Sequence, residues 1–343
     1  MKVAIPVMVL AAGAAWALRL PPSPPPRDGA VIDGHVVIAY SPGYRVSFFG
    51  IERLHPFDIA KYDKIAQHLR DEGLAREADF FVPDAPTVAQ LGAVHDPAYL
   101  TALRDPAVLS RAIEVDLPGV LPGWVLERRV LRPFRRAVGG TVVAARGAIQ
   151  HGMGINIGGG YHHARPEMGH GFCVYNDVAY ALHVLRSEGF DKNVLIVDTD
   201  AHQGDGNHAF FQDDPSVYSM SLHQQDLFPH PKLKGDMDIG LSGGIRDDAF
   251  LETLEGNLAH VLDQDSYGLL IHVAGSDILA DDPLAGMAVS VEGLVARDRM
   301  VARAAAARQI PLLIVLAGGY GPSSALAQGQ ALAAVLRDAQ ENR

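Results

Sequence analysis

The stretch VLIVDTDAHQGDG, residues 194–206, joins an unbroken apolar run to a group of acidic, histidine and glycine residues. Such a run is typical of a strand that is buried on both faces of a parallel sheet. Other apolar runs with strand-like content occur at residues 36–39, 155–157, 218–222, 269–274 and 312–316. Between them, segments such as 177–187 and 291–308 space their apolar residues like amphipathic helices. This alternation predicts a single α/β domain in which helices cover both faces of a parallel sheet.

The composition excludes several classes of protein. The chain has 343 residues, of which 48% are hydrophobic and 20% charged, so it fits one large globular domain rather than a disordered or coiled-coil protein. The formal net charge of −11 argues against a nucleic-acid partner, because such partners are bound by clustered basic residues. Cys173 is the single cysteine, which excludes an internal disulfide and a cysteine-based zinc site. A metal site would therefore use histidine and carboxylate ligands.

The N-terminal segment differs from the rest of the chain. Lys2 precedes an uncharged apolar run, and the triplet Ala15-Trp16-Ala17 resembles a cleavage site for export. Residues 1–18 are therefore predicted to be a signal peptide or, if uncleaved, a short membrane anchor. A Pro-rich linker at 19–30 and the folded domain at 31–340 would follow. We expect an exported or membrane-anchored protein rather than a cytoplasmic one, and the sequence predicts no oligomeric state.

Four of the predicted strands end in glycine-rich or polar segments. These segments are residues 158–172, 198–206, 274–283 and 317–321. The carboxyl ends of parallel strands meet at one edge of a sheet, and α/β proteins bind their ligands there. The four segments therefore predict one site that collects residues from distant parts of the chain.

Asp198, Asp200 and His202 follow a predicted strand at spacings of two residues. If the extended conformation persists, their side chains project to the same side. Two carboxylates and one imidazole, with Asp277 from another strand end, can hold a divalent metal and leave a position open for water or substrate. The ordinary alternative is that these acids only cap and turn a loop.

The tandem His162 and His163 follow three glycines at the end of another predicted strand. Near a metal, an imidazole oriented by a carboxylate can transfer protons, and Asp198 and Asp205 are the candidate orienting acids. Adjacent side chains on an extended segment point in opposite directions, so we expect only one of the two histidines to face the site. Tyr320, on a glycine-rich turn, could donate a hydrogen bond to a carbonyl oxygen, although an ordinary packed tyrosine is the alternative.

Ordered motifs in this chain resemble the histone deacetylase family. They are YSPGYRVSFFGIERLHPFDIAKY at 40–62, VLRPFRRAVGGTVVAA at 130–145, NIGGGYHHARPEMGHGFCVYND at 156–177, DTDAHQGDGN at 198–207 and AGSDILADDPLAGMAVS at 274–290. The resemblance covers residues 31–337 and is closest to the class IV branch of the family. It implies the arginase/deacetylase fold, a three-layer α/β/α domain with an eight-stranded parallel sheet.

The resemblance also implies two cation sites. A zinc ion, for which ferrous iron can substitute, would be held by Asp200, His202 and Asp277. A structural potassium ion would be held, partly through backbone oxygens, by Asp198, Asp200, His202, Ser221 and Leu222.

The catalytic groups follow from the same resemblance. His163 with Asp205 would be the general base, and His162 with Asp198 the second imidazole. Tyr320 would polarise the carbonyl of the substrate. The wall of an acyl-lysine tunnel would include Gly171 and Phe172.

The activity that the resemblance implies is a metal-dependent amidohydrolase. It would remove acetyl or longer acyl groups from lysine side chains of a protein or peptide, using water that the metal activates. The segment LHQQDLFPHPKLKGDMDIGL, residues 222–241, departs from the animal class IV pattern at the rim of the tunnel. The length of the acyl group therefore does not follow from the resemblance.

Three alternatives remain at this level. An acetylpolyamine or other small acyl-amine hydrolase would favour an acidic rim, for which Asp226, Asp281 and Asp282 are candidates, although solvated surface acids are the more ordinary interpretation. An arginase-like ureohydrolase would need ligands for a second metal, but Gly204 and Leu279 stand at the corresponding positions. A catalytically inactive binding module is disfavoured because every reactive group of the site is present.

Overall fold

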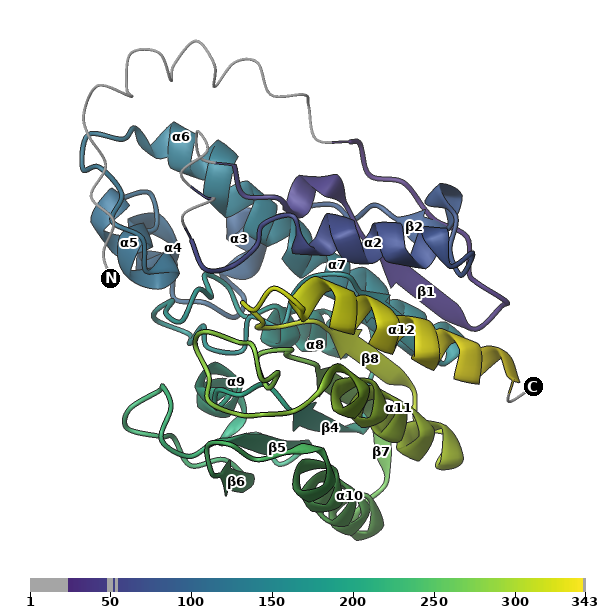
Figure 1. Ribbon diagram of the computed structural model, residues 1–343. Coiled ribbons are helices and arrows are strands. Elements are labelled where there is room, and N and C mark those ends of the chain that lie inside the picture. The colour runs from purple at the N-terminus through teal and green to yellow at the C-terminus, as the bar shows by residue number, and fades with distance from the viewer. Residues whose placement is uncertain (1–23, 48–51, 53–54, 342–343) are drawn as a thin grey trace.

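The computed structural model describes residues 24–47, 52 and 55–341, and these residues form a sheet of eight parallel strands (Figure 1). The strands are β1 Val36–Ala39, β2 Phe80–Phe81, β3 Met153–Asn156, β4 Asn193–Asp198, β5 Val217–Gln224, β6 Met237–Leu241, β7 Tyr267–Val273 and β8 Leu312–Val315. Their order across the sheet is β2-β1-β3-β8-β7-β4-β5-β6. The predicted parallel α/β fold is thus confirmed. The two edge strands, β2 and β6, have no counterpart among the predicted apolar runs.

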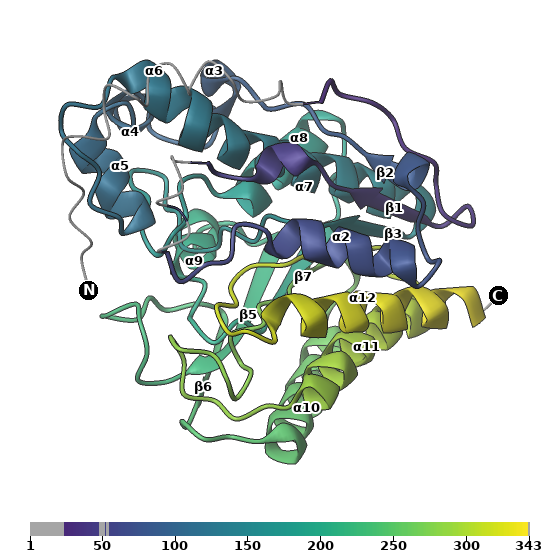
Figure 2. The ribbon, with the colours of Figure 1, turned by 45° about the horizontal axis from the view of Figure 1, so that its top comes forward.

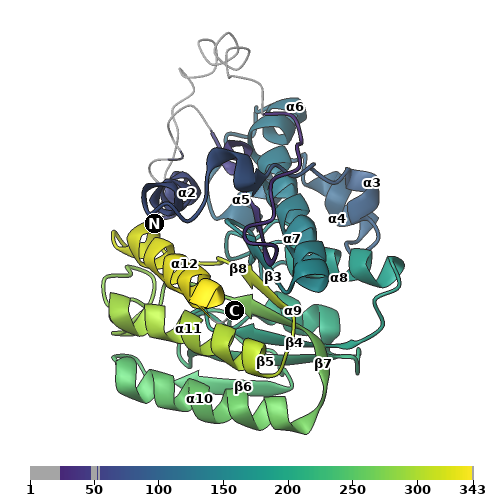
Figure 3. The same cartoon turned by 90° about the vertical axis from the view of Figure 1, so that its right-hand side faces the viewer.

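Helices cover both faces of the sheet. Their bounds are α2 Lys61–Asp71, α3 Val88–Leu91, α4 Pro97–Ala102, α5 Pro106–Ile113, α6 Gly123–Leu126, α7 Arg132–His151, α8 Asp177–Ser187, α9 Asp205–Phe211, α10 Asp247–Gln264, α11 Val291–Ala307 and α12 Ser324–Glu341. Figure 2 shows α2, α12 and α11 side by side, and Figure 3 shows α11 and α12 on the opposite side of the sheet from α7 and α8. The chain therefore has the three-layer α/β/α arrangement.

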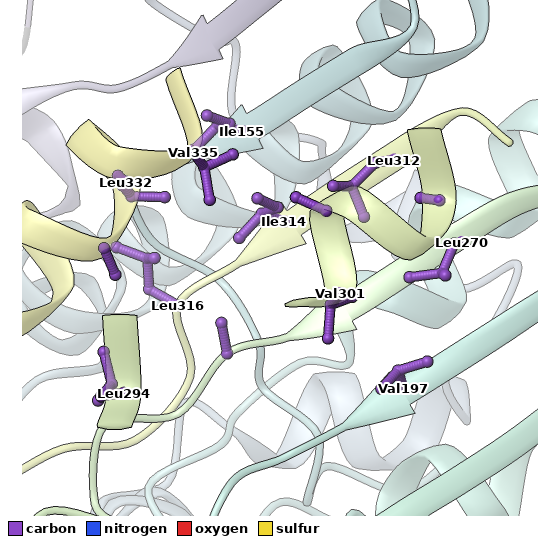
Figure 4. Close-up of a cluster of buried hydrophobic side chains, with 14 of the residues drawn as sticks. Ile155, Val197, Leu270, Leu294, Val301, Leu312, Ile314, Leu316, Leu332 and Val335 are labelled. Carbon is purple, nitrogen blue, oxygen red and sulfur yellow. The ribbon is translucent and has the colours of Figure 1, made fainter. Parts of the chain in front are cut away.

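Alternation along the strands divides the core into two layers. In β8, Leu312 and Ile314 belong to the buried cluster that includes residues of α2, α10, α11 and α12, and Figure 4 shows Val301 of α11 and Val335 of α12 in it. Leu313 and Val315 belong to the cluster that contains α7 and α8. All four side chains of β8 are almost completely buried. Because successive strand residues point to opposite faces, one apolar run supplies both layers, which explains why the runs are continuous rather than alternating.

The N-terminal predictions lie mostly outside the described residues. The signal peptide or anchor at 1–18 falls outside them entirely, and so does the first part of the linker at 19–30. The described part of that linker packs on the domain, since Arg27 and Val82 exchange backbone hydrogen bonds of 3.1 and 2.9 Å. Within the described residues, the structure contains no helix whose length and hydropathy would let it cross a bilayer.

The central position of β8 makes Ile314 a test of the core. Replacing it with alanine is expected to lower the free energy of unfolding by about 2–5 kcal/mol, because the cavity left between β8 and the helices cannot fully close. Leu326→Ala is the control: its side chain is 52% exposed, and the expected change is within about 0.5 kcal/mol. Chemical denaturation of both variants measures the difference. Equal stability of the two variants would contradict this packing.

Candidate active site

The ends of β4 and β7 bring Asp200, His202 and Asp277 together. Each offers one ligand atom, and these atoms lie within 4.8 Å of one another. His202 Nδ1 is 2.9 Å from Asp277 Oδ2 and 3.2 Å from Asp200 Oδ1. All three side chains are buried. The structure thus gathers the predicted ligand set into one cluster whose donors suit a divalent metal.

The buried negative charges of this cluster are electrostatically unfavourable in the absence of a positive charge. Burial raises the pKa of Asp277 to about 7, and the neighbouring Asp200 carboxylate adds to the shift. Burial acts to lower the pKa of His202, but its hydrogen bonds to the carboxylates of Asp200 and Asp277 outweigh burial and raise this pKa to about 10. Two buried carboxylates beside one imidazole are the groups that a bound divalent cation stabilises.

Two glycines leave room for the carboxylates. A Cβ atom at Gly318 would lie 2.5 Å from Asp277 Oδ2 and 2.6 Å from Asp200 Oδ2. A Cβ atom at Gly275 would lie 2.1 Å from Asp200 Oδ2. Any side chain at these positions would displace the ligand atoms, so the backbone of two strand ends forms a close cradle for the cluster. The residues present therefore fit a divalent metal.

The segment after β4 does not continue as a strand. It bends after Asp198, and the carboxylates of Asp198 and Asp200 accept hydrogen bonds from the backbone N–H groups two residues further on, at 3.1 and 2.9 Å. These acids therefore do form turns, as the ordinary interpretation of the motif expects. The turns separate the two side chains: Asp200 joins the metal cluster, whereas Asp198 accepts a hydrogen bond from His162 Nδ1 at 2.7 Å.

His162 and His163 both line the pocket, so the expectation that only one would face the site is wrong. The reason is local: the glycines 158–160 all have positive φ, and residues 162–163 lie in a turn rather than in an extended segment. The two rings consequently pack with their centroids 4.1 Å apart.

The two histidines have opposite electrostatic environments. Burial acts to lower the pKa of His162, but the carboxylates of Asp198 and Asp200 outweigh it and raise this pKa to about 9. Burial lowers the pKa of His163 to about 3, and the adjacent His162 adds to the shift although Asp205 opposes it. These surroundings favour the protonated form of His162 and the neutral form of His163.

Asp205 contacts two further side chains in addition to the predicted partner His163. His163 Nδ1 lies 2.7 Å from one carboxylate oxygen, and Arg165 Nε donates to the other at 2.8 Å. His170 Nε2 lies 2.9 Å from that second oxygen. Arg165 thus gives the carboxylate that orients His163 a cationic partner. Sequence reasoning missed Arg165 and His170, although both belong to the glycine-rich segment that follows β3.

Tyr320 lies on the turn after β8. The buried Lys61 stabilises this turn, because its Nζ donates a hydrogen bond to Gly318 O at 2.7 Å. The backbone N–H groups of Tyr320 and Gly321 donate to Asp282 Oδ2 at 2.7 and 3.2 Å. Asp282 is 7% exposed, so it caps this turn and the candidate role as a rim acid is wrong. Burial raises the pKa of Tyr320 well above its usual value, and its hydroxyl keeps its proton.

Aromatic rings surround the entrance to these groups. The Phe172 ring lies 5.6 Å from Tyr320 and 4.4 Å from His55, and all three line the pocket. Gly171, the other predicted wall residue, has φ of +55°, and a Cβ there would lie 2.5 Å from His163. Phe228, which the sequence did not single out, packs its ring 5.0 Å from that of His163. An apolar chain thus has aromatic surfaces on its way to the histidines.

The residues of the predicted potassium site also lie close together. Asp198 pairs with Ser221 in the register of β4 and β5, and Leu222 is the next residue of β5. Ser221 Oγ lies 2.9 Å from His223 Nδ1, so its side chain already has a partner. A hydroxyl with one such partner still has lone pairs for a cation, and the potassium site stays a prediction.

Comparisons with known proteins agree with this geometry. The family model for the histone deacetylase domain matches residues 55–336. Histone deacetylase 2 of Arabidopsis thaliana is 36% identical over 293 residues, which cover 84% of this chain and 76% of that protein. An uncharacterized protein of Picosynechococcus sp. is 35% identical over 284 residues, covering 82% and 91% of the two chains.

A solved structure supports the fold. The crystal structure of the HDA15 HD domain superposes with a TM-score of 0.71 at 21% sequence identity and covers 89% of this chain and 87% of that chain. The match between folds, together with the sequence matches over most of the chain, gives the assignment. This chain belongs to the histone deacetylase family.

Proposed function

We propose that this protein is a metal-dependent deacylase that hydrolyses the amide between an acyl group and the side-chain amine of lysine in a protein or peptide. One observation carries the proposal: His162, His163 and Tyr320 line a pocket with aromatic walls, both histidines are paired with aspartates, and the buried cluster of metal-ligand residues lies directly beside them. An amide carbonyl brought to this point has a proton acceptor and hydrogen-bond donors beside it. The aromatic walls suit the four-methylene stem of lysine.

The metal would be held by Asp200, His202 and Asp277. We propose zinc, with ferrous iron as the second choice, because two carboxylates and one imidazole leave an open position. When bound there, the metal would polarise the amide carbonyl and lower the pKa of water.

His163 supplies the base in this proposal. With its Nδ1–H donated to Asp205, Nε2 keeps a lone pair and accepts the proton of the attacking water. The same atom returns the proton to the leaving amine. Its low pKa keeps this imidazole neutral at the start of the reaction.

His162 and Tyr320 act on the negative charge that develops at the carbonyl oxygen. The Tyr320 hydroxyl donates a hydrogen bond to that oxygen, and the raised pKa of Tyr320 means that it donates without losing its proton. The imidazolium of His162, held by Asp198, places a positive charge in the same buried space. A charge fixed in a water-poor site stabilises the transition state more than it would in bulk water.

The geometry disfavours a ureohydrolase with two metals. A Cβ atom at Gly204 would lie 2.3 Å from Asp198 Oδ2, so a carboxylate ligand does not fit at this position. Leu279 is apolar and 2% exposed. Among the residues that the structure describes, one group of potential metal ligands is found, and it is the triad above.

A small acylated amine is the second candidate substrate. Glu52 and Glu114 line the same pocket, and their carboxylates would attract a cationic amine such as a polyamine. These two carboxylates support a polyamine substrate less strongly than the aromatic walls support an acyl-lysine substrate.

The substrate class is tested by the release of free amine. The full chain is incubated with an acetyl-lysine peptide, a long-chain acyl-lysine peptide and an acetylated polyamine, each with and without a chelator. We expect chelator-sensitive turnover of at least one peptide. Turnover of the polyamine alone would move the function to small-molecule hydrolysis, and no turnover by the metal-loaded protein would refute the proposed activity.

Tyr320→Phe tests the carbonyl donor. Loss of one hydrogen bond to the developing charge is expected to lower kcat by on the order of 10² while fold and metal content stay unchanged. Tyr218→Phe, on β5 and away from the pocket, serves as the control. Unchanged turnover of the Tyr320 variant would remove this residue from the mechanism.

Asp277→Asn tests the ligand assignment. The amide is a poorer ligand for zinc than a carboxylate, so we expect the purified variant to retain much less metal than the parent. Asp281→Asn, a neighbouring acid outside the triad, is the control and should retain the parental amount. Elemental analysis gives the metal per chain, and full occupancy in the Asp277 variant would contradict the assignment.

A further inference from the structure

A buried ion pair of α11 contacts the segments that carry the proposed metal ligands. Arg297 and Asp298 are consecutive residues of α11, and Arg297 Nε donates to Asp298 Oδ1 at 2.7 Å. Their side chains are 0% and 1% exposed. Removing two charges from water is expensive, and such a pair is often no more stabilising than apolar residues of the same size. The contribution of Arg297 is therefore to be found in its other contacts.

The other end of the guanidinium donates to two strand ends. Arg297 NH1 lies within hydrogen-bond distance of Gly275 O, and it donates to Thr199 O at 3.3 Å. Thr199 follows β4 and immediately precedes Asp200, whereas Gly275 follows β7 and lies two residues before Asp277. One side chain thus holds the two segments that supply all three metal ligands.

The position of Gly275 makes this contact specific. A Cβ atom there would lie 2.1 Å from Asp200 Oδ2, so the backbone at Gly275 is in close contact with a metal ligand from the other strand. Fixing the carbonyl of Gly275 therefore fixes the distance between the two ligand segments. Thr199 is fixed further, since its hydroxyl lies 3.0 Å from the buried His272 Nε2.

We propose that Arg297 is a positioning residue that clamps the ends of β4 and β7, so that Asp200, His202 and Asp277 are held ready for the metal. The inference rests on the proposed metal site. Groups behind a ligand shell commonly change metal affinity by about 10- to 100-fold when they are removed. The clamp therefore predicts weaker metal binding rather than an unfolded protein.

The test is a zinc titration of the metal-free full chain against a fluorescent chelator. Because Arg297→Met alone would leave the Asp298 charge buried and unpaired, the informative variant is Arg297→Met with Asp298→Leu, which removes both charges. We expect its Kd for Zn²⁺ to rise by about 10- to 100-fold. The unfolding temperature of the metal-free variant should stay near that of the parent.

The control removes a second ion pair of α11, which links the partly exposed Arg299 to Asp338 of α12, a carboxylate that also accepts a hydrogen bond from Arg303. Arg299 donates to Asp338 at 2.8 and 2.9 Å, so Arg299→Met with Asp338→Leu should leave the Kd unchanged. Arg297→Lys keeps the charge opposite Asp298 but has no planar fork, and an intermediate Kd is expected.

The outcomes separate this inference from the proposed function. A parental Kd in the folded Arg297 and Asp298 variant would overturn the clamp. A raised Kd in the Arg299 and Asp338 control would also overturn it, because the effect would then follow from loss of any ion pair on α11. If the unaltered chain binds zinc but releases no amine from any substrate, the proposed activity fails while the titration still decides the role of Arg297. Failure of the unaltered chain to bind zinc would contradict both.

Discussion

The repulsion between the buried carboxylates of Asp200 and Asp277 is the constraint on which this structure depends. Two like charges this close and this buried are stabilised by a nearby positive charge, and the surrounding backbone holds them in place. At positions 275 and 318 only glycine fits, because a Cβ atom there would collide with these carboxylates. The turn that carries Tyr320 belongs to the same arrangement, because Gly318 N donates to Asp200 Oδ2 at 2.9 Å. The proposed metal ligands and the proposed carbonyl donor are thus parts of one backbone framework.

Most of the sheet could be predicted from its apolar runs, because a central parallel strand is buried on both faces and is therefore largely apolar. The two edge strands could not be predicted from the sequence, for physical reasons. β2 is two residues long, and β6 alternates between more and less exposed residues, with Asp238 and Gly240 interrupting its apolar residues. Neither produces a continuous apolar run. The number of strands came from the family resemblance, not from periodicity.

The position of the site could also be predicted, since the polar segments stand directly after strands. Details that depend on backbone conformation could not. The turn at residues 162–163 follows from three glycines with positive φ, and it turns both imidazoles to one side. Asp282 looks like a surface acid in the sequence but accepts backbone hydrogen bonds from the Tyr320 turn. Phe228 and Arg297 reach the site by tertiary contact from distant segments, and no local pattern marks them.

The central claim is that the acidic cluster at the ends of β4 and β7 binds one divalent metal. Diffraction from crystals of the zinc-loaded protein, recorded above and below the zinc absorption edge, tests it most directly. The account predicts one anomalous peak within bonding distance of Asp200, His202 and Asp277. A peak elsewhere, or none at these three residues in a protein that retains zinc, would contradict it.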